Sequence, residues 1–136
     1  MNEELKLTIP PGLPGLEDIK SYTLRDVPGN AFFKLLQSAE DQEVAFLVLN
    51  PRHFFPHYQV KINSGTFNEL EGNSLEDLEV YCIVTVAEKR EDMTANLLAP
   101  LLVNREKGMA RQVILEDTEY KTKHPVFSAR QKEECG

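Results

Sequence analysis

Short runs of β-branched, aliphatic and aromatic residues recur along the chain, and clusters of turn residues separate them. Two of these runs, 5–9 and 58–62, alternate apolar and polar residues with the period of two that is typical of a half-buried strand. Proline, glycine and asparagine stand between the runs, as in PPGLPG and VPGN, and these residues favour turns. The sequence therefore predicts strands at 5–9, 44–49, 58–62, 80–87 and 111–115.

Helical signals are few and short. Residues 66–70 fit one helical turn, and Ser74 and Asp77 fit the capping pattern S-x-x-D ahead of Leu78. The chain has 136 residues, which predicts one domain with a core of its own, and residues 128–136 form a polar tail beyond the last apolar pattern. We therefore predict an all-β fold with one or two short helical turns, for which a small barrel or a sandwich is the natural architecture.

The stretch NLLAPLLVN at 96–104 has the composition of a core segment, yet it contains a proline. Pro100 lacks the amide hydrogen that a strand interior needs, so it fits a strand end, an edge or a bulge. We expect 94–99 and 101–103 to belong to strands, with a change of direction or of strand partner near Pro100. Asn96 either ties the backbone at this bend through its side-chain amide or is simply a turn residue.

The segment NPRHFFPHY at 50–58 contains the clearest local candidates for a site. His53 and His57 are four residues apart, but Pro56 between them is disfavoured inside a helix. No HExxH pattern and no carboxylate or cysteine at ligand spacing completes a metal site there. The same segment carries three aromatic residues that either pack in the core or anchor a partner protein. They are Phe54, Phe55 and Tyr58.

No arrangement typical of an enzyme stands out in the sequence. Ser38, Ser64 and Ser74 lie in turn-like segments without a G-x-S-x-G elbow, and Cys82 lies in an apolar run that favours an inert thiol. The segment PPGLPG has prolines where a phosphate-binding loop needs free amides. We therefore predict that the protein is not an enzyme and uses no metal or cofactor. The alternative is a small ligand-binding barrel or an enzyme of unknown substrate.

The chain carries a net charge of −7, and its sharpest acidic block lies between residues 69 and 79. This charge disfavours contact with nucleic-acid phosphates, and it favours a basic protein partner, whose association it would accelerate. An ordinary solvated acidic face is the alternative. The block consists of Glu69, Glu71, Glu76, Asp77 and Glu79.

Nothing in the sequence indicates contact with a membrane. No apolar run approaches the roughly 20 residues that span a bilayer, and the start MNEELKL lacks the basic and apolar parts of a signal peptide. Cys82 in a core-like run and Cys135 in the polar tail suggest reduced thiols rather than a disulfide. We therefore expect a cytoplasmic protein.

Three segments resemble, in order, the FliW flagellar assembly factors. They are IPPGLPGLED near the start, FFKLLQSAEDQEVAFLVLNPRHFFPHY in the first half and VTVAEKREDMTANLLAPLLVNREKGMARQVIL in the second. Together they cover most of residues 9–115, and NLLAPLLVN resembles a signature of this family. The match differs at His57, where the family pattern has an acidic residue.

The resemblance implies a small antiparallel β-barrel at residues 1–127, without a catalytic motif. It also implies a protein of the bacterial cytoplasm that binds newly made flagellin. A second implied partner is CsrA, a basic RNA-binding repressor of flagellin translation, which such a protein keeps from the messenger. No direct contact with nucleic acid is expected. The residues that we predict to bind partners are Phe54, Phe55, Tyr58, Glu69, Glu71, Glu76 and Asp77.

Overall fold

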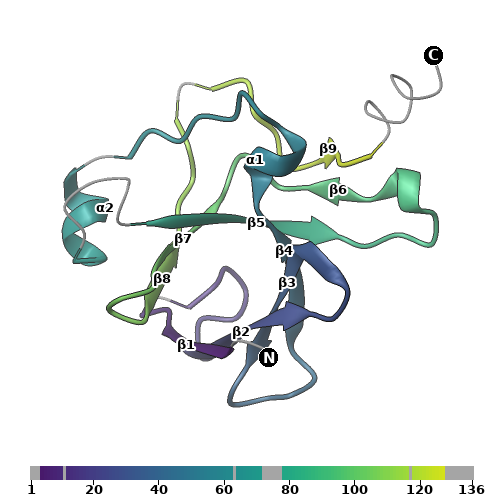
Figure 1. Cartoon of the computed structure of the whole chain (residues 1–136). Helices are drawn as coiled ribbons and strands as arrows, with labels where there is room; N and C mark the ends of the chain where they lie inside the picture. Colours follow the sequence, from purple (N-terminus) through teal and green to yellow (C-terminus); the bar gives the residue numbers. More distant parts are fainter. Residues whose placement is uncertain (1–3, 11, 63, 72–77, 117, 128–136) are drawn as a thin grey trace.

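The computed structural model describes residues 4–10, 12–62, 64–71, 78–116 and 118–127 (Figure 1). In this part of the chain, strands dominate and the helices are short, which confirms the predicted all-β class. The strands are β1 (Glu4–Thr8), β2 (Ser21–Val27), β3 (Asn30–Ser38), β4 (Ala45–Leu49), β5 (Glu79–Thr85), β6 (Thr94–Ala95), β7 (Leu101–Asn104), β8 (Met109–Gln112) and β9 (His124–Pro125). The helical elements are α1 (Pro51–Phe54), α2 (Ser64–Glu69) and the 3₁₀ turn η2 (Arg90–Asp92).

Seven of these strands close into a barrel. Around the ring they follow the order β1, β2, β3, β4, β5, β7 and β8. Neighbours are antiparallel except β8 and β1, which run parallel and meet at Met109 and Thr8. The short strands β6 and β9 pair with each other beside the end of β5. The predicted small barrel is therefore confirmed, with one parallel seam.

The central strands are apolar on both faces because they separate two hydrophobic cores. Consecutive side chains of a strand point to opposite faces, so Val48 belongs to the core inside the barrel and Leu49 to a second core outside it. Tyr81 and Cys82 on β5 divide in the same way. All four residues of β7 are buried for this reason. A fully buried side chain of this size stabilises the fold by about 1.5–3 kcal/mol, so both cores contribute.

The outer core needs a cover, and irregular segments provide it. The segment after α1 contributes Tyr58 and Val60, and the segment after β8 contributes Leu115. Farther along the chain, Val126 joins the same core. In Figure 1 these covering segments pass above β5, on the side of the barrel that also carries α1, β6 and β9.

The chain changes strand partner near Pro100, as predicted. Both β6 and β7 pair with β5, through Ala95 opposite Val84 and Leu101 opposite Tyr81. The second partner, however, changes from β9 for β6 to β8 for β7. The predicted strand over 94–99 is wrong beyond Ala95, because residues 96–100 leave the ladder as a bulge.

The bulge has its own hydrogen bonds. The side-chain oxygen of Asn96 accepts from the amides of Leu98, at 3.1 Å, and Ala99, at 3.0 Å. The carbonyl oxygen of Pro100 accepts from the amide of Val113 at 3.0 Å. Of the two roles considered for Asn96, the structure supports the one in which its amide ties the bend.

Other expectations about the strands need correction. Residues 58–62 pair with no strand in the described part of the chain, and β8 ends at Gln112 rather than at 115. The alternation at 58–62 reflects burial of every second side chain on the outer core, not pairing. The hairpin of β2 and β3 escaped detection because Asp26 and Lys34 interrupt its apolar pattern, and these two residues face each other across the hairpin.

Gly12, in the segment PPGLPG, lies so close to the backbone of Glu17 that a larger residue fits there only if the backbone shifts. Its φ angle is 71°, and a Cβ atom at this position would lie 2.6 Å from the Cα atom of Glu17. We predict that Gly12→Ala lowers the free energy of unfolding by more than about 1 kcal/mol, because the backbone must both shift and hold a strained conformation. Gly15→Ala is the matched control, since Gly15 has a φ of 84° with nothing within 4 Å of the added atom. Urea denaturation gives the free energy of unfolding of each variant, and Gly12→Ala should lose more of it than Gly15→Ala. Equal losses of stability in the two variants would contradict the close approach of the backbone at Gly12.

Candidate partner-binding surface

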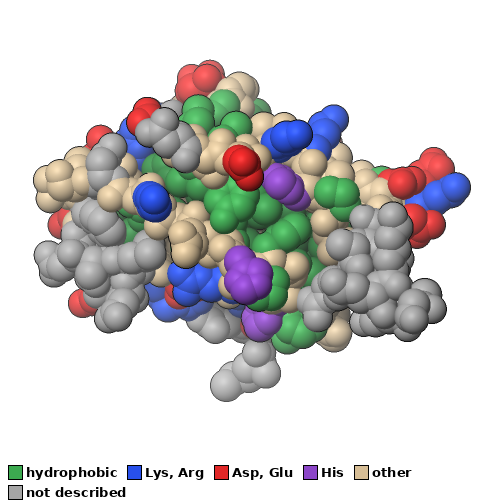
Figure 2. Space-filling model, turned by 90° about the horizontal axis from the view of Figure 1, so that it is seen from above, with side chains coloured by type: hydrophobic (Ala, Val, Ile, Leu, Met, Phe, Trp, Pro, Cys, Tyr) green, Lys and Arg blue, Asp and Glu red, His purple; other side chains and the backbone are tan. Residues whose placement is uncertain are grey.

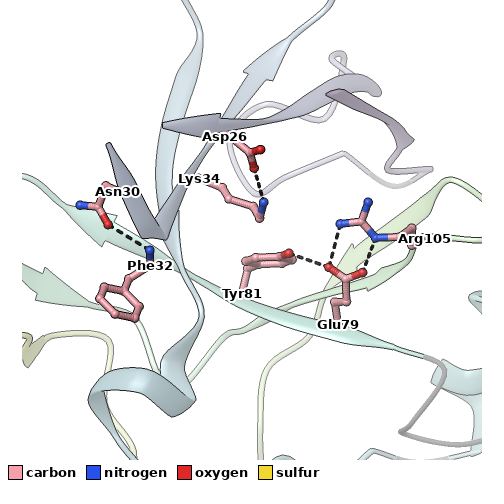
Figure 3. A network of polar contacts seen from close by, with 7 residues as sticks. All are labelled: Asp26, Asn30, Phe32, Lys34, Glu79, Tyr81 and Arg105. Carbon is pink, nitrogen blue, oxygen red and sulfur yellow. Dashed lines mark hydrogen bonds and ion pairs between the residues drawn. The ribbon is translucent and has the colours of Figure 1, made fainter. Parts of the chain in front are cut away.

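Aromatic rings gather where the start of β3 meets α1. Phe32 is 47 % exposed, and its ring centroid lies 4.7 Å from that of His53 and 5.9 Å from that of Phe54. Two hydrogen bonds fix the backbone here. The side-chain oxygen of Asn30 accepts from the Phe32 amide at 3.0 Å (Figure 3), and the Asn50 amide donates to the Phe32 carbonyl at 3.4 Å. The second of these bonds ties the start of α1 to β3.

Phe127 and Arg90 extend this group of rings. The Phe127 ring stands at 89° to the Phe54 ring, with 5.8 Å between centroids. The guanidinium of Arg90 lies 4.2 Å from the centre of the Phe127 ring, a cation–π contact. We term Phe32, His53, Phe54, Phe127 and Arg90 the aromatic patch. Aromatic residues and arginine are the side chains most enriched at protein–protein contacts.

The sequence explains why α1 is a single turn. The side-chain oxygen of Asn50 caps it by accepting from the Arg52 amide at 3.0 Å, and Pro51 occupies the first turn, where its missing amide hydrogen costs nothing. The helix ends at Phe54, ahead of Pro56. This short helix turns the His53 ring toward Phe32. Figure 2 shows the face above the barrel, where histidine side chains lie next to an area of hydrophobic side chains.

Two of the three predicted aromatic anchors lie partly at the surface. Phe54 belongs to the aromatic patch, and Phe55 is half-buried against the outer core. Tyr58 is only 5 % exposed, and its hydroxyl donates to the Leu97 carbonyl at 2.6 Å. Burial raises the pKa of Tyr58 above its ordinary value. Tyr58 is thus a core residue, and the expectation that it anchors a partner at the surface is corrected.

Phe32 was missed from the sequence, although the pair FF at 32–33 carried a signal. Neighbouring strand residues point to opposite faces, so both rings cannot enter the same core. Phe33 is buried in the outer core, whereas Phe32, near the start of β3, is exposed. Phe127 and Arg90 are distant from it in sequence, and no local pattern connects them.

The acidic block is less uniform than its sequence suggests. Glu69 is exposed and forms an ion pair with Arg111, and Glu71 is exposed. Glu76 and Asp77 lie outside the described residues. Glu79 is half-buried and paired with an arginine at the end of the barrel. Of the described members, only Glu71 is an exposed carboxylate for which no ion pair is found among the described residues.

Five polar side chains close one end of the barrel interior (Figure 3). We term them the polar cluster: Asp26, Lys34, Glu79, Tyr81 and Arg105. Glu79 accepts from Arg105 Nε at 2.5 Å and Nη2 at 3.2 Å, and from the Tyr81 hydroxyl at 2.6 Å. Lys34 forms an ion pair with Asp26. Two acids thus meet two bases, so this cluster adds little net charge to the surface.

Other residues considered for chemistry show no such arrangement. Among the described residues, no three histidine, cysteine or acidic side chains come together as a metal site would require. Burial raises the pKa of the Cys82 thiol to about 12, which keeps it protonated. The part of the chain that the structure describes contains no helix long and apolar enough to cross a membrane.

Comparison with known proteins identifies the family. The family model described as FliW protein matches residues 1–126. The chain belongs to the FliW family. Flagellar assembly factor FliW of Bacillus subtilis (strain 168) is 38 % identical over 126 residues, which cover 93 % of this chain and 88 % of that protein. The protein of the same name from Bacillus licheniformis is 40 % identical over the same shares of both chains.

A solved structure supports the same assignment. The crystal structure of the flagellar assembly factor FliW matches with a TM-score of 0.83 and 34 % sequence identity, over 90 % of this chain and 85 % of that one. The resemblance to FliW proteins seen in the sequence is therefore confirmed. The FliW-like segment FFKLLQSAEDQEVAFLVLNPRHFFPHY contains most of β3 and all of β4 and α1, and so supplies three of the five residues of the aromatic patch.

The polar cluster predicts how stability depends on pH. Arg105 holds the pKa of Glu79 below its ordinary value of 4.5, so Glu79 stabilises the fold above that pH, and this contribution is lost as the pH falls through the lowered pKa. We predict that, on acidification from neutral pH to about pH 3, the free energy of unfolding of Glu79→Gln falls less steeply than that of the wild type. Urea denaturation at each pH measures the slope.

The matched control for Glu79→Gln is Glu43→Gln, which changes an exposed carboxylate between β3 and β4. This variant should keep the wild-type slope. If the free energy of unfolding falls with pH equally steeply in the wild type and in Glu79→Gln, the pairing of Glu79 with Arg105 does not couple folding to proton binding.

Proposed function

We propose that the chain binds flagellin and the translational repressor CsrA, and that binding of CsrA relieves its repression of flagellin translation. The observation that carries this proposal is the match to the FliW family over residues 1–126, together with relatives that bear the name of flagellar assembly factors. A role in binding rather than in catalysis accords with those names.

The two partners would act in turn. While flagellin accumulates in the cytoplasm, it occupies the chain, and CsrA remains on the messenger. When flagellin is exported, the chain is released, captures CsrA and allows translation to resume. Such exchange requires that each complex be reversible, so a few strong contacts within a modest interface suit it better than an extensive one.

The aromatic patch is the contact surface that we propose for at least one of the two partners. Phe32 combines a large exposed ring with a fixed backbone, and it leans on His53 and Phe54. A rigid aromatic residue loses little conformational entropy on binding and buries a large area. Phe55 remains a predicted contact beside the patch.

Charge would act on the rate of association with CsrA. The chain carries a net charge of −7, and a basic partner is attracted to it over a distance that salt shortens. Phosphates of an RNA bound to CsrA would be repelled by the same charge. Each exposed ion pair is worth under about 1 kcal/mol, so apolar contacts must supply most of the affinity.

Phe32→Ala tests the patch. We predict that it raises the Kd for flagellin, for CsrA or for both by about 10- to 30-fold, as expected for an aromatic residue at the centre of an interface. Val86→Ala is the matched control, since Val86 is 64 % exposed and lies outside the patch. Calorimetric titration with each purified partner gives the values. Unchanged Kd values for both partners, with the fold intact by circular dichroism, would remove the patch as a contact.

Glu71→Lys tests steering by charge. We predict that it slows association with CsrA several-fold at low ionic strength, and that the difference from the wild type shrinks as salt is added, because rim charges act mainly on the association rate. Glu43→Lys makes the same change of net charge elsewhere on the surface and should have a smaller effect. Stopped-flow kinetics over a range of salt concentrations distinguish the two. Equal rates for both variants would mean that only the net charge matters and not the acidic block. Charge reversal at Glu76 and Asp77 can be compared with Glu43→Lys in the same way, by the rate of association with CsrA.

A further inference from the structure

Two segments with the sequence of strands face each other across a groove without pairing. One is 59–62 in the cover of the outer core, and the other is 113–116, which continues from β8. Two adjoining hollows of about 300 and 390 Å³ lie between them and share Lys61, Leu115 and Glu116 as lining residues. Both segments were predicted as strands from the sequence, wholly or in part, yet neither has a strand partner along this groove among the described residues.

The backbone of the second segment has one paired edge and one open edge. Val113 donates its amide hydrogen to the Pro100 carbonyl at 3.0 Å, and Leu115 donates to the Leu98 carbonyl at 2.8 Å. In an extended chain, the peptide groups of successive residues point to opposite edges. Those of Ile114 therefore face away from residues 98–100, and they have no backbone partner among the described residues.

The opposite wall, residues 59–62, also has backbone groups without backbone partners among the described residues. The Gln59 amide donates to the hydroxyl of Tyr120 at 3.0 Å. For Val60, Lys61 and Ile62, no backbone hydrogen bond to another described residue is found. Unpaired extended backbone at a protein surface is a ready template for another strand.

The side chains that line the groove determine which side chains a bound segment can have. Ile114 is 73 % exposed, and Glu116 follows it on the same side of the extended segment. Glu119 also lines the groove, as does Lys61 on the other wall. Among the described residues, the lining thus combines apolar side chains with two carboxylates and one ammonium group.

We propose that this groove binds an extended segment of a partner protein, which adds to residues 113–116 as a further β-strand. The peptide groups of the segment pair with those of Ile114 and Glu116, for which no backbone hydrogen bond to another described residue is found. An apolar side chain of the segment covers Ile114, and a basic side chain two residues away on the same face lies opposite Glu116. This site is separate from the aromatic patch and goes beyond the proposed function, because it defines the conformation and side-chain pattern that a bound segment must have.

A library of displayed peptides about ten residues long, the upper range of strand lengths, tests the pattern. Selection on the whole chain should enrich peptides with an apolar residue and a lysine or arginine two positions apart. Ile114→Lys should weaken binding of a selected peptide about tenfold, and Glu116→Lys should weaken it about twofold to fivefold. Glu116→Lys should also shift a new selection toward acidic peptides.

The chain offers matched controls for both variants. Val86→Lys places the same charge on another exposed aliphatic residue, and Glu106→Lys reverses another exposed carboxylate. Both should bind the selected peptide like the wild type. If no peptide binds saturably, or if the controls weaken binding as much as the variants of the groove, the proposal is overturned. None of these substitutions alters the aromatic patch, so such a failure leaves the proposed binding of flagellin and CsrA to be judged by its own test.

Two measurements address the strand itself. N-methylation of a peptide amide that faces residues 113–116 should weaken binding by about tenfold or more, whereas methylation of the next amide should not, because only alternate amides face the wall. Hydrogen exchange should show a fast Ile114 amide in the free chain and a slow one with peptide bound. Equal effects of methylation at successive amides, or an Ile114 amide already as protected as those of β5 in the free chain, would refute strand addition.

Discussion

Burial of both faces of the same strands is the constraint on which the rest of this structure depends. β4, β5 and β7 place alternate side chains in the interior core and in the outer core, so a shift of one residue would exchange the two sets. Their register is therefore fixed from both sides. It also follows that the apolar outer face must be covered, and the irregular segments that carry Tyr58, Val60, Leu115 and Val126 cover it.

This arrangement separates the features that the sequence predicts from those it does not. The runs at 44–49 and 80–87 are apolar except for Thr85, and they form β4 and β5, two of the strands that lie between the cores. The run at 58–62 alternates apolar and polar residues as a strand does. This alternation shows that one side of the segment is buried, but it does not show whether the backbone forms hydrogen bonds with a neighbouring strand. Tyr58 was misplaced for the same reason, since its ring belongs to the inward set. The change of strand partner near Pro100 was predicted because proline limits the backbone whatever its surroundings, but the length of the bulge at 96–100 was not.

The candidate surface was predictable only in part, because it is assembled from distant segments. Phe54 was found from its loop, whereas Phe32, Phe127 and Arg90 come from β3, the end of the described chain and η2. For the acidic block, the sequence suggested one continuous surface that the structure does not form. Neighbours in sequence are separated in space, with Glu79 facing Arg105 at the barrel end and Glu69 facing Arg111. Formal charge therefore overstates the field that a partner meets, since paired carboxylates contribute little beyond a few ångströms.

The parallel seam has a consequence for the order in which the molecule is made. It joins β1 to β8 at Thr8 and Met109, and the Thr8 amide donates to the Gly108 carbonyl at 2.8 Å. Closing so long a loop is slow compared with forming the hairpins of β2, β3 and β4, which connect neighbours in sequence. On the ribosome, β1 can pair with β2 early, but its seam with β8 cannot form until β8 has emerged from the exit tunnel. The strand that carries Phe32 is thus among the earliest parts to form, and Phe127 follows β8 in the chain, so a growing chain completes the aromatic patch only after the last strand of the ring has been made.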